Sequence, residues 1–128
     1  MEDMSSSRAT AIAVARLLEE HKAEDTVVLE VGPVCSWTDY FVIATARSTT
    51  HMGSLLDRVL AALDERSVAR RNSSRDSVES GWVLIDCGNV VVHLMDQEKR
   101  DFYELEKLWF MAAEVYSSSS TSSASSSS

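Results

Sequence analysis

The stretch from Gly81 to Met95 constrains the fold more than any other part of this chain. Two apolar runs, Trp82 to Asp86 and Val90 to Met95, are rich in valine and isoleucine and are separated by the three residues Cys-Gly-Asn. Strand-like runs joined by such a short, glycine-containing turn are typical of a β-hairpin. Because both alternating faces of each run are apolar, we predict that the hairpin lies inside a sheet covered on both sides.

The sequence after the hairpin predicts a helix that Asp96 opens, because acidic groups suit the first turn of a helix. At helical spacing, one stripe should face the core: Phe102, Leu105, Leu108, Trp109 and Ala112. Tyr103 and Phe110 fall outside this stripe. Two interpretations stay open: the pair belongs to a protein-contact surface, or it covers a neighbouring loop or a second layer.

Two earlier segments are predicted to be strands. Residues 26–31 and 39–46 are rich in β-branched and aromatic residues, and Gly32 and Pro33 end the first of them. Since only a few residues join the two segments, we expect antiparallel neighbours. Residues 68–71 are a candidate for a short strand at a charged sheet edge.

Two other segments carry apolar residues at helical spacing. The first covers residues 8–22, with Ser7 as its cap, and the second is a long helix that Ser48 or Thr49 can cap. The long helix presents one unbroken apolar face, formed by Met52, Leu55, Leu56, Val59, Leu60 and Leu63.

Together these elements predict a single α/β domain, with a mixed sheet of four to five strands and helices on both faces. A chain of 128 residues with 45% hydrophobic residues fits one domain with one core. We place this domain at residues 8–116, after a flexible N-terminus of residues 1–7. Residues 117–128 are serine at ten positions, so we expect a disordered tail.

The charge balance restricts what the protein can bind. The net charge is −8 and the pI is about 4.8, so no basic excess is available to displace counterions from a nucleic-acid backbone. We therefore expect a basic protein as partner and no direct nucleic-acid readout.

Three features indicate the cytoplasm. Cys35 and Cys87 show neither metal-site nor disulfide spacing, which favours free thiols in a reducing compartment. No apolar run approaches membrane length, so no membrane partner is expected. The first residues, with Glu2 and Asp3, lack the cationic start of a signal peptide.

Carboxylates recur near the predicted strand ends, at Asp39, Asp86 and Asp96, which raises the hypothesis of a metal-dependent nucleotidyl-transfer enzyme. The spacing disfavours it, since Gly53-Ser54 lies inside a predicted helix instead of in a loop before two alternating acids. No phosphate loop, nucleophile elbow or Cys/His ligand set is present. We predict no catalytic residue, no metal site and no cofactor.

Two histidines have local interpretations. His93 lies on the face of Val91 and Met95 in the second hairpin run, and we predict a hydrogen-bonded sheet histidine there. His51 lies in the first turn of the long helix beside Ser48, where it would help to form a small polar pocket for an anion.

Three motifs together resemble one protein family. They are TDYFVIATARSTTHMGSLLDRV, then WVLIDCGNVVVHLM, and finally RDFYELEKLW. Over residues 8–110 their order is similar to that of the ribosomal silencing factor family, RsfS, also called Iojap or DUF143. The C-terminal part is specific: a tryptophan opens a strand, an acid and a glycine stand at the hairpin turn, and VVVH and YELEKLW follow in fixed order.

The resemblance implies a single α/β domain with a nucleotidyltransferase-like topology and no enzymatic activity. It also implies a partner, the large ribosomal subunit, bound through the fourteenth protein of that subunit at the subunit interface. Binding there would sterically block the small subunit and silence translation under nutrient limitation. Because organelle members of the family take part in large-subunit assembly, a biogenesis role stays open as an alternative.

The family's contact residues, carried over by position, fall on Trp82, Tyr103, Glu104 and Leu105. Phe110 joins this predicted partner-binding set as the second aromatic outside the core stripe. Family members are known as dimers, so a homodimer of the free protein through the same aromatics is a further hypothesis.

Overall fold

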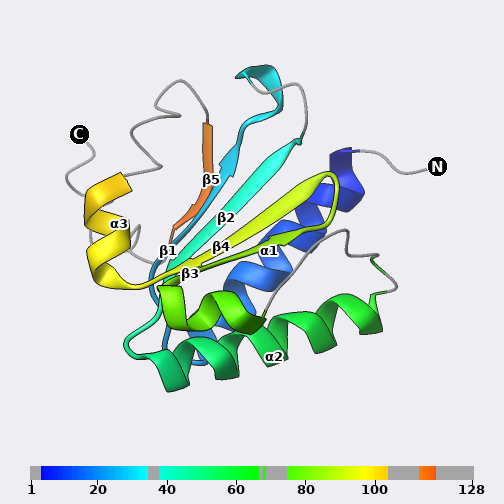
Figure 1. The fold of residues 1–128 in the computed structure, drawn as a ribbon. Helices are drawn as coiled ribbons and strands as arrows, with labels where there is room; N and C mark the ends of the chain where they lie inside the picture. Colours follow the sequence, from blue (N-terminus) through cyan, green and yellow to red (C-terminus); the bar gives the residue numbers. More distant parts are fainter. Residues whose placement is uncertain (1–3, 35–37, 67, 69–74, 104–112, 118–128) are drawn as a thin grey trace.

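Five strands form one mixed sheet in the order β3-β4-β2-β1-β5. The computed structural model of the chain describes residues 4–34, 38–66, 68, 75–103 and 113–117. The strands are β1 (Glu24–Glu30), β2 (Tyr40–Thr45), β3 (Trp82–Asp86), β4 (Val90–Met95) and β5 (Ala113–Ser117). The predicted mixed sheet of an α/β domain is confirmed (Figure 1).

The centre of the sheet is a parallel pair, β2 and β4, in register from Tyr40 with Val90 to Thr45 with Met95. The other three neighbouring pairs are antiparallel. The predicted antiparallel pairing of β1 with β2 is confirmed, and so is the hairpin of β3 and β4. The remaining pair joins β1 to β5, which the sequence patterns did not predict as a strand.

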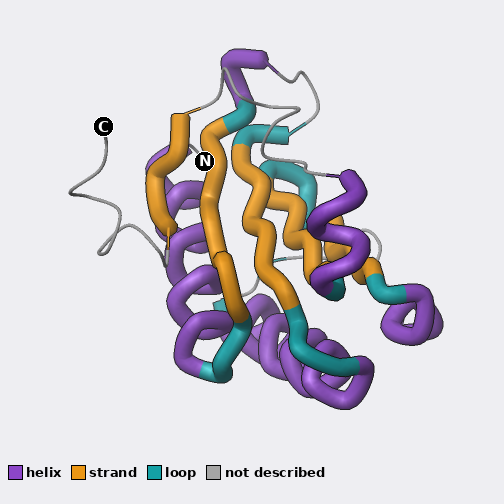
Figure 2. The backbone as a smooth tube through the Cα atoms, turned by 90° about the vertical axis from the view of Figure 1, so that its left-hand side faces the viewer, coloured by secondary structure: helices purple, strands orange, loops and turns teal. Residues whose placement is uncertain are grey.

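Helices cover both faces of the sheet, as predicted. They are α1 (Met4–Glu20), α2 (Thr49–Glu65) and α3 (Gln97–Tyr103), with the short 3₁₀ helices η1 (Gly32–Val34) and η2 (Arg75–Ser80). Figure 2 shows the strands between α1 on one side and α3 on the other. Ser48 caps α2, because its hydroxyl oxygen accepts a hydrogen bond from the backbone N–H of His51. No described helix has the length and apolarity needed to cross a membrane.

The sheet has a hydrophobic core on each face. The larger core lies under α1 and α2, which contribute Ala11, Val14, Leu18, Met52, Leu55, Leu56, Val59 and Leu63. The smaller core lies on the opposite face and contains Val27, Leu29, Val31, Phe41, Ile43, Val91 and Met95. Because alternate residues of β2 and β4 enter the two cores, every residue of both strands is buried.

The prediction that both hairpin strands are covered on both sides is wrong for β3. This strand lies at the edge of the sheet and has one neighbour, β4, so fewer side chains surround each of its residues. Leu84 is 38% exposed as a result. Of the candidate edge strand at residues 68–71, only Val68 is described, and it lies in no strand.

The face of α3 that meets the sheet also differs from the prediction. Phe102, expected on the core stripe, is 76% exposed, whereas Arg100 is only 6% exposed. Residues two positions apart in a helix are separated by about 200° around its axis, so an inward Arg100 turns Phe102 outward. The rest of the predicted stripe lies outside the described residues: Leu105, Leu108, Trp109 and Ala112.

Arg100 ties α3 to the sheet through its guanidinium group. Its Nη1 donates to Thr45 Oγ1 at 2.8 Å, and its Nη2 donates to the carbonyl oxygen of Asp25 at 2.7 Å. The two acceptors belong to β2 and β1, so one side chain connects the helix to both strands. Hydrogen bonds from a charged donor are the stronger kind.

The hairpin and α3 meet at a junction between Gly81 and Asp96. The backbone N–H of Asp96 donates to the carbonyl oxygen of Gly81 at 2.8 Å, and Asp96 Oδ1 accepts from the backbone N–H of Lys99 at 2.8 Å. Asp96 thus opens α3 as predicted. Gly81 has a φ of 90°, and a Cβ atom there would clash with Asp96 Oδ2. The junction therefore favours glycine, because any other residue would be strained in φ and would have to displace the Asp96 carboxylate.

Gly81→Ala should destabilise the protein more than Gly88→Ala. Both glycines have positive φ, 90° and 87°, so either substitution costs about 1–2 kcal/mol of backbone strain. At Gly81 the new methyl group must also push the Asp96 carboxylate out of its capping position, which adds about 1 kcal/mol. Urea unfolding measures the difference, and equal losses would show that Asp96 moves without cost.

Arg100→Met should loosen α3, because it removes the two hydrogen bonds to the strands and keeps an unbranched apolar chain. The expected loss of stability is about 2–3 kcal/mol. Hydrogen exchange of the amides in residues 97–103 should accelerate. Lys99→Met is the matched control, since it also removes a charge from α3, and it should leave exchange unchanged. Similar exchange in both variants would refute the anchoring role of Arg100.

Candidate docking surface around Trp82

Trp82 is the first residue of β3 and lies half-buried against the smaller core. In register it is paired with Met95 of β4, and Met95 is paired with Thr45 of β2. These three residues form one row across the sheet. Since Arg100 of α3 bonds to the Thr45 side chain, α3 and Trp82 lie on the same face of the molecule.

Only part of the predicted partner-binding set falls within the described residues. Tyr103 is the last residue of α3, and its side chain lies outside the described part of the structure. The same holds for Glu104, Leu105 and Phe110. The structure therefore describes the surroundings of Trp82, and the contact role of the others stays a prediction.

The imidazole of His93 holds the Trp82 indole. Trp82 Nε1 donates to His93 Nδ1 at 3.2 Å, and the two ring centroids are 6.0 Å apart. Phe41 packs edge-on against the same imidazole, with 4.8 Å between the two ring centroids. Because Nδ1 accepts a hydrogen bond, the proton of the neutral ring lies on Nε2. The predicted hydrogen-bonded sheet histidine is confirmed.

The hydrogen bond between Trp82 and His93 was not predicted from the sequence, although the register of the hairpin strands indicates that the two side chains are close. In the hairpin, Trp82 is paired with Met95 and Leu84 is paired with His93. Trp82 and His93 are therefore diagonal neighbours on one face, within reach of a large aromatic side chain.

His93 is 4% exposed. Burial, followed by the charge of Arg100, lowers the pKa of this imidazole from 6.5 to about 4, so the ring is neutral at pH 7. Its Nε2 has no hydrogen-bond partner among the described residues. A buried donor without a partner costs free energy, so the packing of the hairpin alone does not account for a histidine here.

The three carboxylates that raised the metal-site hypothesis do not converge. Asp39 precedes β2 and Asp86 ends β3, so both lie where β4 begins, whereas Asp96 follows the far end of β4. Asp86 Oδ1 accepts from the backbone N–H of Gly88 at 2.9 Å, and Asp96 caps α3. Among the described residues, no group of three His, Cys, Asp or Glu side chains could hold a metal ion.

His51 connects two helices and does not form an anion pocket. Its Nδ1 accepts from the backbone N–H of Arg47 at 2.9 Å, and its Nε2 lies 2.8 Å from the carbonyl oxygen of His21. Both ring nitrogens are therefore used within the chain. They join the start of α2 to the end of α1, and no ring nitrogen is left for an anion.

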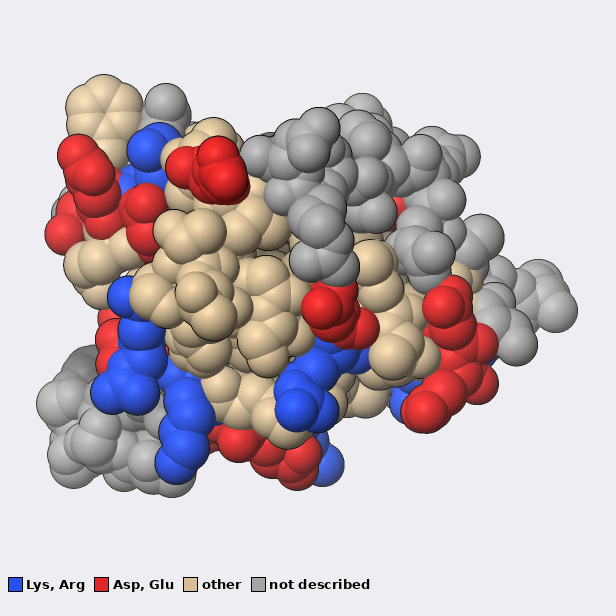
Figure 3. Space-filling view, turned by 60° about the horizontal axis from the view of Figure 1, so that its bottom comes forward, with Lys and Arg blue, Asp and Glu red and all other residues tan. Residues whose placement is uncertain are grey.

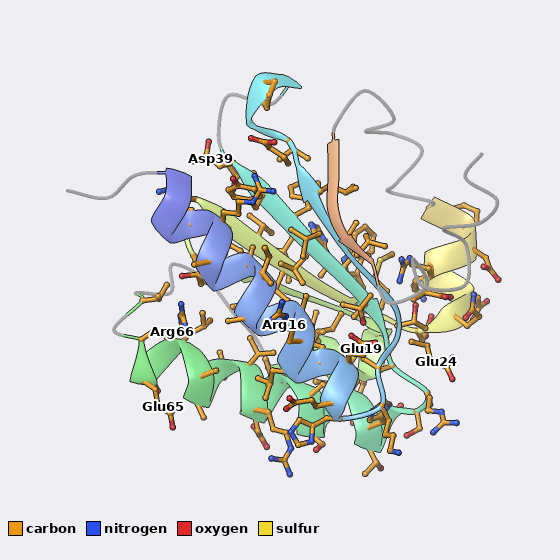
Figure 4. All side chains as sticks on the ribbon, turned by 180° about the vertical axis from the view of Figure 1, so that it is seen from behind. Arg16, Glu19, Glu24, Asp39, Glu65 and Arg66 are labelled. Atoms are coloured by element: carbon orange, nitrogen blue, oxygen red, sulfur yellow. The ribbon has the colours of Figure 1, made fainter. Side chains whose placement is uncertain are left out.

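A groove of about 360 Å³ lies between α1 and α2, on the other side of the sheet from Trp82. Alanine, valine and leucine side chains line it together with charged residues of both signs: Arg16, Glu20, Glu65 and Arg66. Figure 4 shows Arg16 on α1 and the last two of these at the end of α2. In Figure 3, acidic and basic side chains likewise surround an uncharged area on one face. The described residues on the face drawn in Figure 3 thus carry charges of both signs.

Comparison with known proteins points to one family. The family described as "Ribosomal silencing factor during starvation", RsfS, matches residues 4–128. The chain is 36% identical to the ribosomal silencing factor RsfS of Treponema pallidum over 105 residues, which cover 81% of this chain and 93% of the relative. It is 30% identical to RsfS of Bacillus subtilis over 95 residues, which cover 74% of this chain and 80% of that relative. The resemblance seen in the sequence motifs is confirmed.

An organelle protein and a solved structure are also similar. The mouse protein named "Mitochondrial assembly of ribosomal large subunit protein 1" is 35% identical over 97 residues, 73% of this chain and 42% of the relative. The chain thus spans less than half of that relative. A crystal structure of a Chromobacterium violaceum protein has a TM-score of 0.72 and 32% identity, covering 84% of this chain and 87% of that one.

Part of the loss of stability at low pH should depend on His93. The pKa of His93 is lowered to about 4 in the folded state, whereas it is about 6.5 in the unfolded state. The unfolded state therefore takes up this proton first as the pH falls. The stabilisation is complete above about pH 6.5 and is lost progressively down to about pH 4. Between pH 7 and pH 5 the contribution of this group is roughly 2 kcal/mol.

His93→Phe is the matched variant, because it keeps an aromatic ring and removes the titrating group. Urea unfolding of both proteins at pH 7 and pH 5 gives the difference, in which the carboxylates common to both cancel. The variant should lose less stability on acidification. An equal loss in the two proteins would exclude His93 as a source of the pH dependence.

Proposed function

Because the chain belongs to the RsfS family of ribosomal silencing factors, we propose that it represses translation by docking on the large ribosomal subunit. It binds there through the fourteenth protein of the subunit, at the subunit interface, and sterically prevents the small subunit from joining when nutrients are limited. It acts in the cytoplasm, uses no cofactor and catalyses no reaction. Family membership supports the broader class, a ribosome-associated regulator of translation.

The placement of Trp82 supports this docking mode. A half-buried tryptophan at the rim of a sheet offers a partner a large apolar contact, and tryptophan is enriched among the residues that dominate binding energies. Leu84 follows on the same edge strand and is 38% exposed. Since α3 covers the same face and ends at Tyr103, one partner can contact the strand and the helix together.

The charge of the chain supports a protein partner. With a net charge of −8, the protein is repelled by the phosphate backbone of ribosomal RNA. A basic ribosomal protein attracts it and orients its approach. An acidic domain can therefore select a protein patch on a surface that is otherwise mainly anionic.

A role in assembly of the large subunit is the second candidate function. The 35% identical mouse relative carries that role in its name. Docking on the same subunit face serves both functions, because a protein that blocks the small subunit also protects an immature large subunit from premature joining.

Two rival hypotheses remain testable with the purified protein. Nucleotidyl transfer predicts magnesium-dependent binding of nucleoside triphosphates, and a calorimetric titration that shows no heat would remove it. A homodimer of the free protein predicts a larger hydrodynamic size without the ribosomal partner than expected for one chain. Sizing the protein alone and with that partner decides whether self-association competes with docking.

Trp82→Ala and Tyr103→Ala should each weaken co-sedimentation with isolated large subunits. We expect losses of about 2 kcal/mol or more in binding free energy, the size found for aromatic residues at the centre of an interface. Sedimentation with separated large and small subunits, followed by quantification of the bound fraction against protein concentration, measures the change.

Leu17→Ala is the matched control, since Leu17 is a partly buried apolar residue in the groove on the opposite face, and it should bind as the unmodified protein does. If both aromatic variants also bind normally, the docking surface is wrong. If the unmodified protein sediments with the small subunit, the proposed function itself is wrong.

A further inference from the structure

The Trp82 indole carries a single polar group, the Nε1–H, and that group points into the protein. It donates to Nδ1 of His93, which is 4% exposed. The part of the indole that remains accessible on this half-buried residue therefore consists of carbon atoms. A buried tryptophan N–H usually finds a hydrogen-bond partner, and here that partner lies inside the same chain.

We propose that His93 is a positioning residue for docking: by accepting the Trp82 N–H bond, it fixes the indole with its carbon edge outward, so that the partner meets an apolar ring. The inference rests on the proposed function, which supplies the partner, and it specifies how this contact is set. His93 itself does not touch the partner, because it is buried beneath the ring that does.

The surroundings of His93 fit a fixed acceptor. Phe41 packs edge-on against the imidazole at 4.8 Å, and the flanking strand residues are all buried, so the ring has little freedom to turn. Burial and the nearby Arg100 charge lower the pKa of His93 to about 4, which keeps the ring neutral at pH 7. The hydrogen bond from Trp82 then places the remaining proton on Nε2, so that Nδ1 can accept.

This arrangement favours binding in two ways. The indole N–H is already paired inside the protein, so docking removes only carbon surface from water and leaves no donor unsatisfied. The ring is also held in one orientation before the partner arrives, which reduces the rotamer entropy lost on binding. A Trp82 side chain without the His93 bond would lose both advantages.

A double-mutant cycle on affinity for isolated large subunits tests the proposal. His93→Leu should weaken binding about fivefold to tenfold, the value of one such hydrogen bond. In the Trp82→Phe background, which lacks the N–H, the same substitution should change affinity less than about twofold. Equal effects of His93→Leu in both backgrounds would overturn the proposal, because a purely structural residue acts independently of the indole donor.

A spectroscopic readout separates positioning from general loss of structure. The indole N–H resonance of Trp82, assigned through its absence in Trp82→Phe, should exchange slowly with water in the unmodified protein and rapidly in His93→Leu. His93→Asn supplies an oxygen near the position of Nδ1 and should restore slow exchange and most of the affinity. Slow exchange in His93→Leu would overturn the proposal.

A wrong docking surface and a wrong positioning role for His93 give different experimental results. If Trp82→Ala binds large subunits as tightly as the unmodified protein, the positioning role is overturned because Trp82 does not contribute to docking, and if Tyr103→Ala also binds normally, the docking surface of the proposed function is wrong. If Trp82→Ala weakens binding but the cycle is additive, the docking surface stands and only the positioning role is overturned.

Discussion

The parallel pairing of β2 with β4 is the constraint on which the rest of the structure depends. All residues of both strands are buried, and they alternate between two cores. Two apolar faces cannot be left in water, so helices must cover both. α1 and α2 cover one face. α3, which follows β4 directly, covers part of the other, and within the sheet the edge strand β3 is paired with β4 alone.

The smaller core differs from the larger one in its polar content. Arg100 and His93 both lie on that side of the sheet, and each is almost fully buried. Arg100 bonds to β2 and β1, and His93 bonds to the residue that opens β3. Polar contacts of fixed geometry thus define the position of α3 and the orientation of Trp82, where apolar packing alone would leave more freedom.

Sequence reasoning predicted the elements whose signals are local. The hairpin follows from two apolar runs and a short turn, and the long helix α2 follows from an unbroken apolar stripe. Five residues of that stripe are buried as expected, and Leu60 is partly buried: Met52, Leu55, Leu56, Val59 and Leu63 are the buried ones. The antiparallel pair of β1 and β2 follows from the short link between them. The family resemblance, carried by three motifs, is confirmed by relatives at 30–36% identity.

The features that the sequence did not predict depend on contacts between residues that are distant in the chain. The face of α3 is set by hydrogen bonds from Arg100 to Thr45 and Asp25, which no local spacing shows. β5 has the sequence AEVYS and becomes a strand by pairing with β1, far back in the chain. At the candidate docking surface, Trp82 could be selected from its motif, but its bond to His93 required the register of the hairpin.

The pairing of β1 with β5 has a consequence during synthesis. The ribosome completes β1 early, and the segment that covers its outer edge emerges only after the other four described strands have been made. Until then the nascent sheet has an open row of backbone donors and acceptors beside β1, to which another chain can add. Closure of that edge therefore waits for the synthesis of β5, long after β1 itself has been made.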